Sequence, residues 1–171
     1  MLILMSGLPS SGKSVVVDMF KSGNDLLLRP EDWMPNNIDI LGADAEKEYR
    51  IACWKMAIEK SLEAVIETKP SSRIILDCTN SKFFSIASLI GQAKAYKHRV
   101  VLVFVSAKVQ CCEQRSGLAR SIYDEYVENF KHSLPRYKSA CDDIIVIRND
   151  GDKQELIGTV SKIAGRICHT T

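Results

Sequence analysis

Short apolar runs recur along the chain, and turn residues or charged residues bound each of them. The runs lie at Leu2–Met5, Asp25–Leu28, Arg73–Leu76, Val100–Val105 and Ile144–Ile147. A continuous apolar run of this length is typical of a strand that is buried on both faces, as in a parallel sheet. The pattern therefore predicts five buried strands.

The segments between these runs carry apolar residues three or four positions apart, which is the spacing of one helix face. We expect helices over Val15–Phe20, Glu46–Glu67, Lys82–Lys97 and Lys153–Ile167. In the longest of them, the predicted apolar stripe consists of Ile51, Trp54, Ile58, Leu62, Val65 and Ile66.

A further helix is expected in the second half of the chain. Ser121 and Asp124 have the spacing of a capping box, in which a serine side chain caps the helix start and an acid three residues later bonds back. The helix that begins there would carry Ile122, Tyr126 and Phe130 on one face. It should end before Pro135, because proline removes a hydrogen-bond donor and clashes with the preceding turn.

Buried strands that alternate with helices predict the α/β class. We expect a three-layer sandwich, with a mainly parallel five-stranded sheet and helices on both faces. No linker, repeat or low-complexity stretch divides residues 1–171. The sequence therefore predicts a single domain.

Composition indicates the cellular environment of the protein more than its function. The formal net charge of +2 permits a polyanionic partner without indicating one. The six cysteines show no CxxC pair, which favours reduced thiols over a disulfide framework. No apolar run approaches the roughly 20 residues that span a bilayer. We therefore expect a cytoplasmic protein without a membrane partner; its oligomeric state stays open.

One motif carries most of the chemical information. The residues from Gly7 to Ser14 read GLPSSGKS and match the phosphate-loop pattern GxxxxGK[ST], between a predicted strand and a predicted helix. Backbone N–H groups of such a loop hold phosphate oxygens at the start of the helix. Lys13 is expected to reach the β- and γ-phosphates of ATP, and Ser14 to bind Mg²⁺. The residues predicted to bind the nucleotide are Gly7, Pro9, Ser10, Ser11, Gly12, Lys13 and Ser14.

Two missing motifs favour a small kinase over other phosphate-loop proteins. No predicted strand ends in the Asp-Glu pair that motor ATPases usually carry, and no NKxD-like guanine motif is present. A kinase that phosphorylates a hydroxyl group benefits from a carboxylate that accepts the hydroxyl proton.

Acidic residues that follow predicted strands are candidates for this chemistry, since ligands of parallel sheets lie beyond the carboxyl ends of the strands. Asp32 is the first candidate for the catalytic base and Glu31 the second, although either could instead cap a helix. Asp77 could hold Mg²⁺-bound water, or orient Lys13 or an arginine on the substrate side.

The segment 108–121 is expected to form a helical lid over the triphosphate. Arg115 and Arg120 would point about 140° apart on one continuous helix. Gly117 suggests a bend that lets both arginines face one site. Arginine suits this role because its planar guanidinium binds phosphate oxygens in pairs and stays charged.

Five segments in this order resemble the phage-type polynucleotide kinase family over roughly residues 1–165: MSGLPSSGKS, RPEDW, IILDCTN, EQRSGLAR and IIVIRNDGD. The resemblance implies an adenylate-kinase-like phosphate-loop fold and transfer of the ATP γ-phosphate to a 5′-hydroxyl of DNA or RNA. It implies that Arg115 and Arg120 are lid arginines. It also implies that the turn at Asn149 lies near the base of ATP.

The chain departs from this family at the predicted acceptor side. The family usually shows two acids, a large apolar residue and a substrate-binding arginine, whereas Met34 follows Trp33 here. Arg29 or Arg50 could supply the missing guanidinium. Small-alcohol kinases of the chloramphenicol phosphotransferase type also place a single Asp at this point.

Three functions therefore stay open. The first is a kinase for a nucleic-acid hydroxyl, either a 5′-end or the hydroxymethyl group of a modified base. The second is a small-alcohol or antibiotic kinase, and the third is a nucleotide-dependent regulatory binding module. Trp33 and Trp54 suit stacking of a base, although Trp54 lies on the apolar stripe and is expected in the core.

Overall fold

The sheet holds five parallel strands in the order β2-β3-β1-β4-β5. The computed structural model describes residues 1–35, 42–151 and 153–168. The strands are β1 (Leu2–Gly7), β2 (Leu26–Leu28), β3 (Ile74–Asp77), β4 (Val100–Ser106) and β5 (Asp143–Arg148). Each of them falls on a predicted apolar run, so the positions of the strands are confirmed. The edge strands β2 and β5 are only partly buried, however, with Leu26 41% and Val146 57% exposed.

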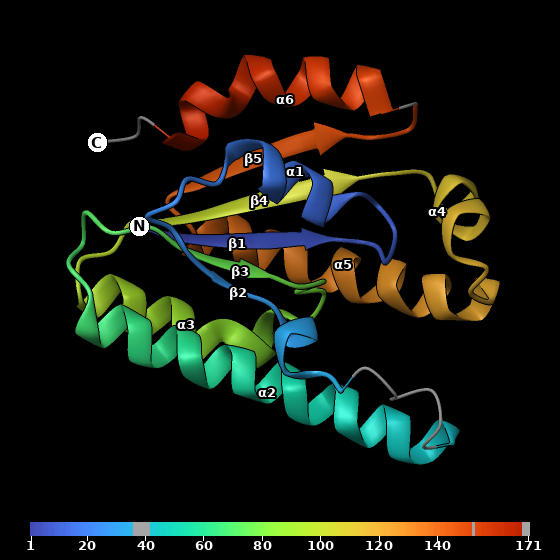
Figure 1. Cartoon of the computed structure of the whole chain (residues 1–171), viewed down its shortest axis with the longest axis horizontal. Coiled ribbons are helices and arrows are strands. Elements are labelled where there is room, and N and C mark those ends of the chain that lie inside the picture. Colours follow the sequence, from blue (N-terminus) through green and yellow to red (C-terminus); the bar gives the residue numbers. More distant parts are fainter. Residues whose placement is uncertain (36–41, 152, 169–171) are drawn as a thin grey trace.

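Helices cover both faces of this sheet, which confirms the predicted three-layer α/β fold (Figure 1). On one face lie α1 (Lys13–Phe20) and α6 (Lys153–Cys168). On the other lie α2 (Ala43–Glu67), α3 (Phe83–Ala95) and α5 (Arg120–Ala140). The carboxyl ends of the strands meet at one edge, beside the short helix α4 (Val109–Ser116).

The alternation of side chains along the strands divides the core into two halves. In β1, Leu2 and Leu4 pack against α2, α3 and α5, whereas Ile3 and Met5 pack against α1 and α6. All four side chains are buried. A strand with apolar residues at every position is therefore what this architecture requires.

The predicted stripe of α2 is only partly correct. Trp54, Ile58 and Leu62 pack against the core and Val65 is buried, but Ile51 and Ile66 are 45% and 47% exposed. The small residues Cys53, Ala57, Ser61 and Ala64 instead complete the buried face. Small side chains let the helix approach the sheet closely, and a periodicity search weighted toward large apolar residues misses them.

Both predicted ends of α5 are wrong. The helix begins at Arg120 with Ala119 as its cap residue, and no side chain caps this end. It continues through Pro135 to Ala140. Pro135 is exposed, whereas Phe130, Ser133 and Tyr137 on either side of it are buried. Packing on the inner face therefore offsets the roughly 3 kcal/mol cost of an internal proline.

The inner face of α5 also differs from the predicted one. Ile122 is 39% exposed, and Tyr123 is fully buried in its place. This change follows from the position at which the helix begins. Gly117 ends α4 in the left-handed region with φ 70°, so the axis of α5 has a different direction from that of α4. The predicted bend at Gly117 is confirmed.

Two further predictions concern the cysteines and membrane-spanning helices. Cys53, Cys78, Cys111, Cys112 and Cys141 are unpaired, as expected. Among the described residues, no helix combines the length and the apolar composition that a membrane span requires.

Candidate functional site: a phosphate loop at the carboxyl edge of the sheet

The phosphate loop joins β1 to α1, and two glycines give it its shape. Gly7 has φ 143° and Gly12 has φ 93°, both in the region that favours glycine. A Cβ on Gly7 would collide with the carbonyl oxygen of Val105, and one on Gly12 would lie 2.5 Å from Asn149 Nδ2. Close approach of neighbouring backbone and side chains therefore requires glycine at both positions.

The turn after β5 and the end of α4 hold the loop from one side. Asn149 Nδ2 donates to the Ser11 carbonyl at 2.7 Å. Arg115 donates to the carbonyls of Ser10 and Asn149 at 3.4 Å and of Gly151 at 3.0 Å. Arg115 and Asn149, which were predicted to bind nucleotide, thus lie next to the loop and next to each other.

The segment after β3 holds the loop from the other side. Gly7 N donates to the Thr79 carbonyl at 3.2 Å, and Asn80 Nδ2 donates to the Met5 carbonyl at 2.7 Å. Tyr137 of α5 donates through its hydroxyl to the Asn80 carbonyl at 2.8 Å. The segment from Asp77 to Asn80 thus fixes the loop to the sheet. Tyr137 was missed at the sequence level, because nothing local marks a tyrosine that bonds across 57 residues.

Lys13 lies at the centre of this arrangement. Its Nζ donates to the carbonyls of Leu8 at 2.8 Å and Gly7 at 3.3 Å. Burial lowers the pKa of Lys13, and the negative charges of Asp77 and Glu31 oppose this shift. Both carboxylates therefore favour the charged form of Lys13.

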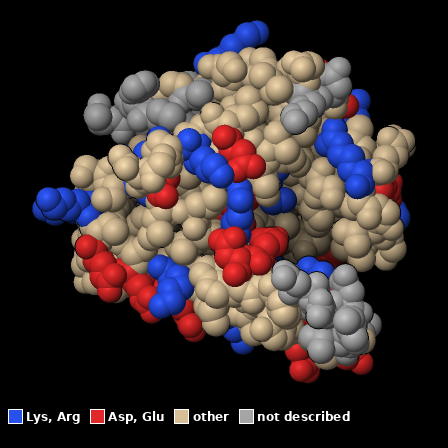
Figure 2. All heavy atoms as spheres, in the orientation of Figure 1, with Lys and Arg blue, Asp and Glu red and all other residues tan. Residues whose placement is uncertain are grey.

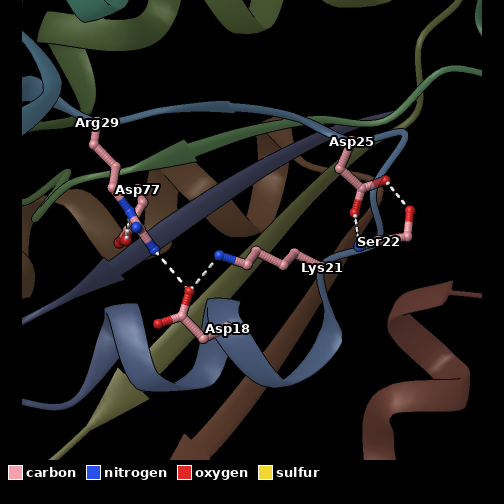
Figure 3. Close-up of polar contacts among 6 residues, drawn as sticks. All are labelled: Asp18, Lys21, Ser22, Asp25, Arg29 and Asp77. Carbon is pink, nitrogen blue, oxygen red and sulfur yellow. Dashed lines mark hydrogen bonds and ion pairs between the residues drawn. The ribbon is translucent and has the colours of Figure 1, made fainter.

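Asp77 takes part in a chain of ion pairs beside the loop (Figure 3). Its Oδ2 accepts from Arg29 Nε at 2.9 Å, and the Arg29 Nη2 lies 3.3 Å from Asp18 Oδ1. Asp18 also pairs with Lys21 at 2.7 Å. Asp77 is buried and would be costly to leave without a cation, so Arg29 compensates its charge.

The two candidate bases lie on the short 3₁₀ helix η1 (Pro30–Trp33). Glu31 and Asp32 are both exposed. Asp32 Oδ2 accepts from the backbone N–H of Arg29 at 3.2 Å, which closes the start of η1. Figure 2 shows acidic side chains gathered where η1 lies, with basic side chains between them and α1. Elsewhere on this face the two signs are interspersed.

A guanidinium lies beside Met34, the residue that stands in place of the expected substrate arginine. Arg50 of α2 contacts Met34 Sδ through Nη1 at 3.7 Å and pairs with Glu46 at 2.7 Å. Trp33 is partly buried and packs against the core. Trp54 also packs there, as expected from its place on the apolar stripe.

The second lid arginine lies apart from the loop. Arg120 pairs with Asp124 at 3.1 Å and with Glu113 at 3.6 Å, and its side chain is 57% exposed. Asp124, the predicted partner of Ser121 in a capping box, is thus an ion-pair partner of Arg120. The contacts of Arg115 and Arg120 therefore differ, although the two residues flank the same bend.

An apolar cavity of about 250 Å³ lies between the loop and α5. Leu8 of the loop, Phe104 of β4 and Phe130 of α5 line it. Its lining is apolar apart from Ser106 and Lys131. We therefore assign it no part in the chemistry.

The loop fits a nucleoside triphosphate with Mg²⁺. The glycines let the loop adopt the φ values that bring its backbone N–H groups together, and Lys13 provides a cation within the loop. Ser14 is exposed at the start of α1 and Asp77 lies nearby at the end of β3, so both can offer oxygen to Mg²⁺ or its water. Among the described residues, the buried Ser11 hydroxyl has no hydrogen-bond partner. The residues present therefore suit phosphate binding.

Comparison with known proteins gives one family and several solved structures. The family model described as AAA domain (AAA_33) matches residues 2–121. Kti12 from Chaetomium thermophilum, solved with ADP-AlF3, is 17% identical with a TM-score of 0.61, covering 95% of this chain and 97% of that one. A sugar kinase from a Janibacter species is 14% identical with a TM-score of 0.59, covering 98% and 95%.

A further likeness is to a chain in the structure of the Pnkp1/Rnl/Hen1 RNA repair complex. It is 17% identical with a TM-score of 0.59, and the match covers 79% of this chain but 45% of that one. No curated protein matches the chain. The structural likenesses show a shared phosphate-loop kinase fold.

Proposed function

The chain belongs to the AAA domain family, and on this premise we propose that it is an ATP-dependent phosphotransferase with a hydroxyl group as acceptor. The observation that carries this proposal is the convergence of two carboxylates on one lysine. Asp77 follows β3, Glu31 follows β2, and the charges of both act on Lys13 of the phosphate loop. A module that only binds a nucleotide has no need of an additional carboxylate on the acceptor side.

Each residue then has a defined task. Lys13 holds the β- and γ-phosphate oxygens, and Ser14 and Asp77 would hold Mg²⁺ or its water, which would neutralise the charge of the phosphates. The acceptor oxygen forms a bond to the γ-phosphorus while the bond to the β,γ-bridging oxygen breaks, so that ADP leaves. The proton of the acceptor hydroxyl passes to a carboxylate on η1.

We favour Glu31 over Asp32 as this base. Asp32 is engaged with the backbone N–H of Arg29, and its loss would first disturb η1 itself. The negative charge of Glu31 raises the pKa of Lys13 and so opposes the effect of burial on the lysine. This order reverses the one expected from the sequence.

The acceptor that we propose is a 5′-hydroxyl of DNA or RNA. The nucleotide that carries this hydroxyl also carries a phosphate on its 3′ side, which requires a cation nearby. Arg29 is engaged with the buried Asp77, whereas the pair of Arg50 with Glu46 is more exposed and easier to exchange, and Arg50 contacts Met34, where the resemblance expects a substrate arginine. Arg50 would therefore bind that phosphate. The likeness to a chain of an RNA repair complex agrees with this acceptor class.

A small alcohol is the second candidate acceptor. Trp33 and Met34 place apolar surface directly after the acids, which suits an apolar alcohol better than a phosphodiester. The likeness to a sugar kinase is consistent with a small acceptor.

Transfer of label from γ-labelled ATP distinguishes these acceptors. The panel consists of DNA and RNA oligonucleotides with 5′-hydroxyl ends, hydroxymethyl-base DNA and small alcohols. We expect label on 5′-hydroxyl oligonucleotides with the wild type and none with Lys13→Ala. Label confined to small alcohols would overturn the acceptor class, and ATP binding without transfer to any acceptor would overturn the kinase itself.

A further inference from the structure

An aromatic ring is exposed at the start of α3, a few residues beyond the segment that holds the phosphate loop. Phe84 is 73% exposed, which is unusual for a phenylalanine. The guanidinium carbon of Arg136 on α5 lies 4.1 Å from the centroid of the ring. The guanidinium therefore lies over one face of the ring, and the two groups form a stacked pair of an aromatic ring and a cation at the surface.

The surroundings hold this ring in a defined orientation. The edge of Phe83 meets Phe84 with centroids 6.1 Å apart and planes at 71°. Phe83 is itself fixed, because it packs edge-on against the buried Tyr137 at 5.2 Å and its N–H donates to Ser133 Oγ at 3.0 Å. The exposed ring is thus supported from the core beneath it.

The ring follows in the chain on the segment that holds the phosphate loop. Asn80, which bonds to the Met5 carbonyl beside the phosphate loop, precedes Phe84 by four residues. Four residues span at most about 15 Å between Cα atoms. An extended single strand covers this distance within a few nucleotides. Lys82 lies between the two positions in the chain and pairs with Glu125 at 3.4 Å; both side chains are exposed, so a phosphate of such a strand can replace the carboxylate.

We propose that Phe84 and Arg136 form a stacking site for a nucleobase a few nucleotides from the 5′-end of a single-stranded acceptor. Aromatic rings and arginine planes bind bases of any identity, because every base has a π-face. This inference rests on the proposed nucleic-acid kinase function. It adds that the enzyme holds the strand downstream of the reacting end and therefore prefers oligomers to mononucleotides.

The test compares Phe84→Ala with Phe84→Trp and with the control Tyr96→Ala. Tyr96 is 44% exposed and lies at the opposite end of α3. Fluorescence anisotropy gives the Kd of labelled 5′-hydroxyl oligonucleotides of increasing length without requiring turnover. We expect Phe84→Ala to weaken binding of the longer strands about fivefold to hundredfold and to leave the shortest unchanged. Phe84→Trp and Tyr96→Ala should bind like the wild type.

An abasic scan locates the stacked base. Each oligonucleotide of the scan lacks one base at a different distance from the 5′-end. Loss of the base at one particular distance should weaken binding to the wild type, and the same loss should leave binding to Phe84→Ala unchanged. If the oligonucleotides are phosphorylated but Phe84→Ala and Tyr96→Ala behave alike, the stacking site is refuted and the kinase function stands. If small alcohols are phosphorylated and oligonucleotides neither bind nor react, the acceptor class itself is wrong. If Phe84→Ala instead abolishes self-association in sedimentation without affecting oligonucleotide binding, the ring belongs to a protein interface and the inference fails.

Discussion

Arg29 Nε lies 2.9 Å from Asp77 Oδ2, and this ion pair connects the segment after β2 to the end of β3. The two residues are 48 positions apart in the chain. Because β2 and β3 are neighbours in the sheet, their carboxyl ends bring the arginine and the aspartate together. The pair fixes η1, with its two acids, relative to the phosphate loop.

Replacing Arg29 should destabilise the protein. Arg29→Ala leaves the buried Asp77 carboxylate without its cation, which should lower the free energy of unfolding by about 3 kcal/mol. Urea denaturation measures this change. Lys21→Ala is the matched control, because its pair with Asp18 is exposed on both sides and should contribute less than about 1 kcal/mol. Equal losses in the two variants would show that Asp77 does not depend on Arg29.

Most of the fold could be predicted from the sequence, for a physical reason. Strands of a parallel sheet are buried on both faces, so each one appears as an apolar run, such as Val100–Val105. The phosphate loop is equally visible, because Gly7 and Gly12 are required by local geometry. Features of this kind depend on a short stretch of chain and leave a mark in it.

The parts that could not be predicted depend on contacts between distant segments. Pro135 lies inside α5 because residues around it pack against the core, and local rules end the helix there. The choice between Glu31 and Asp32 depends on the contacts within η1, where Asp32 accepts from the backbone N–H of Arg29, and adjacent positions in a sequence do not reveal this. The guanidinium of Arg50 beside Met34 likewise arises from the packing of α2 on η1.

The two acids on η1 should differ in their effect on catalysis. Glu31→Gln removes the proposed base and should lower kcat on the order of 10²-fold or more while ADP binding is retained. Asp32→Asn should lower kcat much less, because its main contact is with the backbone N–H of Arg29. Steady-state kinetics together with calorimetric titration of ADP separates the two effects. A large loss of kcat in Asp32→Asn alone would transfer the role of base to Asp32.

The lid arginines should affect different steps. Arg115 already bonds to carbonyls around the loop, so Arg115→Ala should weaken ADP binding roughly tenfold or more. Arg120 is exposed and pairs with Asp124 and Glu113, so in the lid predicted from the sequence it would reach the nucleotide only after closure. Arg120→Ala should therefore lower kcat and leave the Kd of ADP unchanged. Lys138→Ala, an exposed basic position on α5, is the control, and wild-type kinetics in both arginine variants would exclude a two-arginine lid.

Acid should destabilise the protein through His98. This residue is buried, and its Nε2 lies 3.0 Å from the Val65 carbonyl, to which it can only donate. Burial lowers the pKa of His98 below its ordinary value of 6.5 in the folded protein, so the unfolded chain binds the proton more readily. The stability that His98 contributes is therefore fully present above about pH 6.5 and is lost as the pH falls toward the lowered value.

Replacement by glutamine tests this assignment, because glutamine donates a hydrogen bond without taking up a proton. Between pH 7.5 and pH 5.5, the free energy of unfolding of the wild type should fall further than that of His98→Gln. His132→Gln serves as the control, since His132 is exposed on α5 beside Glu128 and its loss should preserve the wild-type pH dependence. If His98→Gln and the wild type lose the same free energy over this interval, His98 is not the group that makes the fold sensitive to acid.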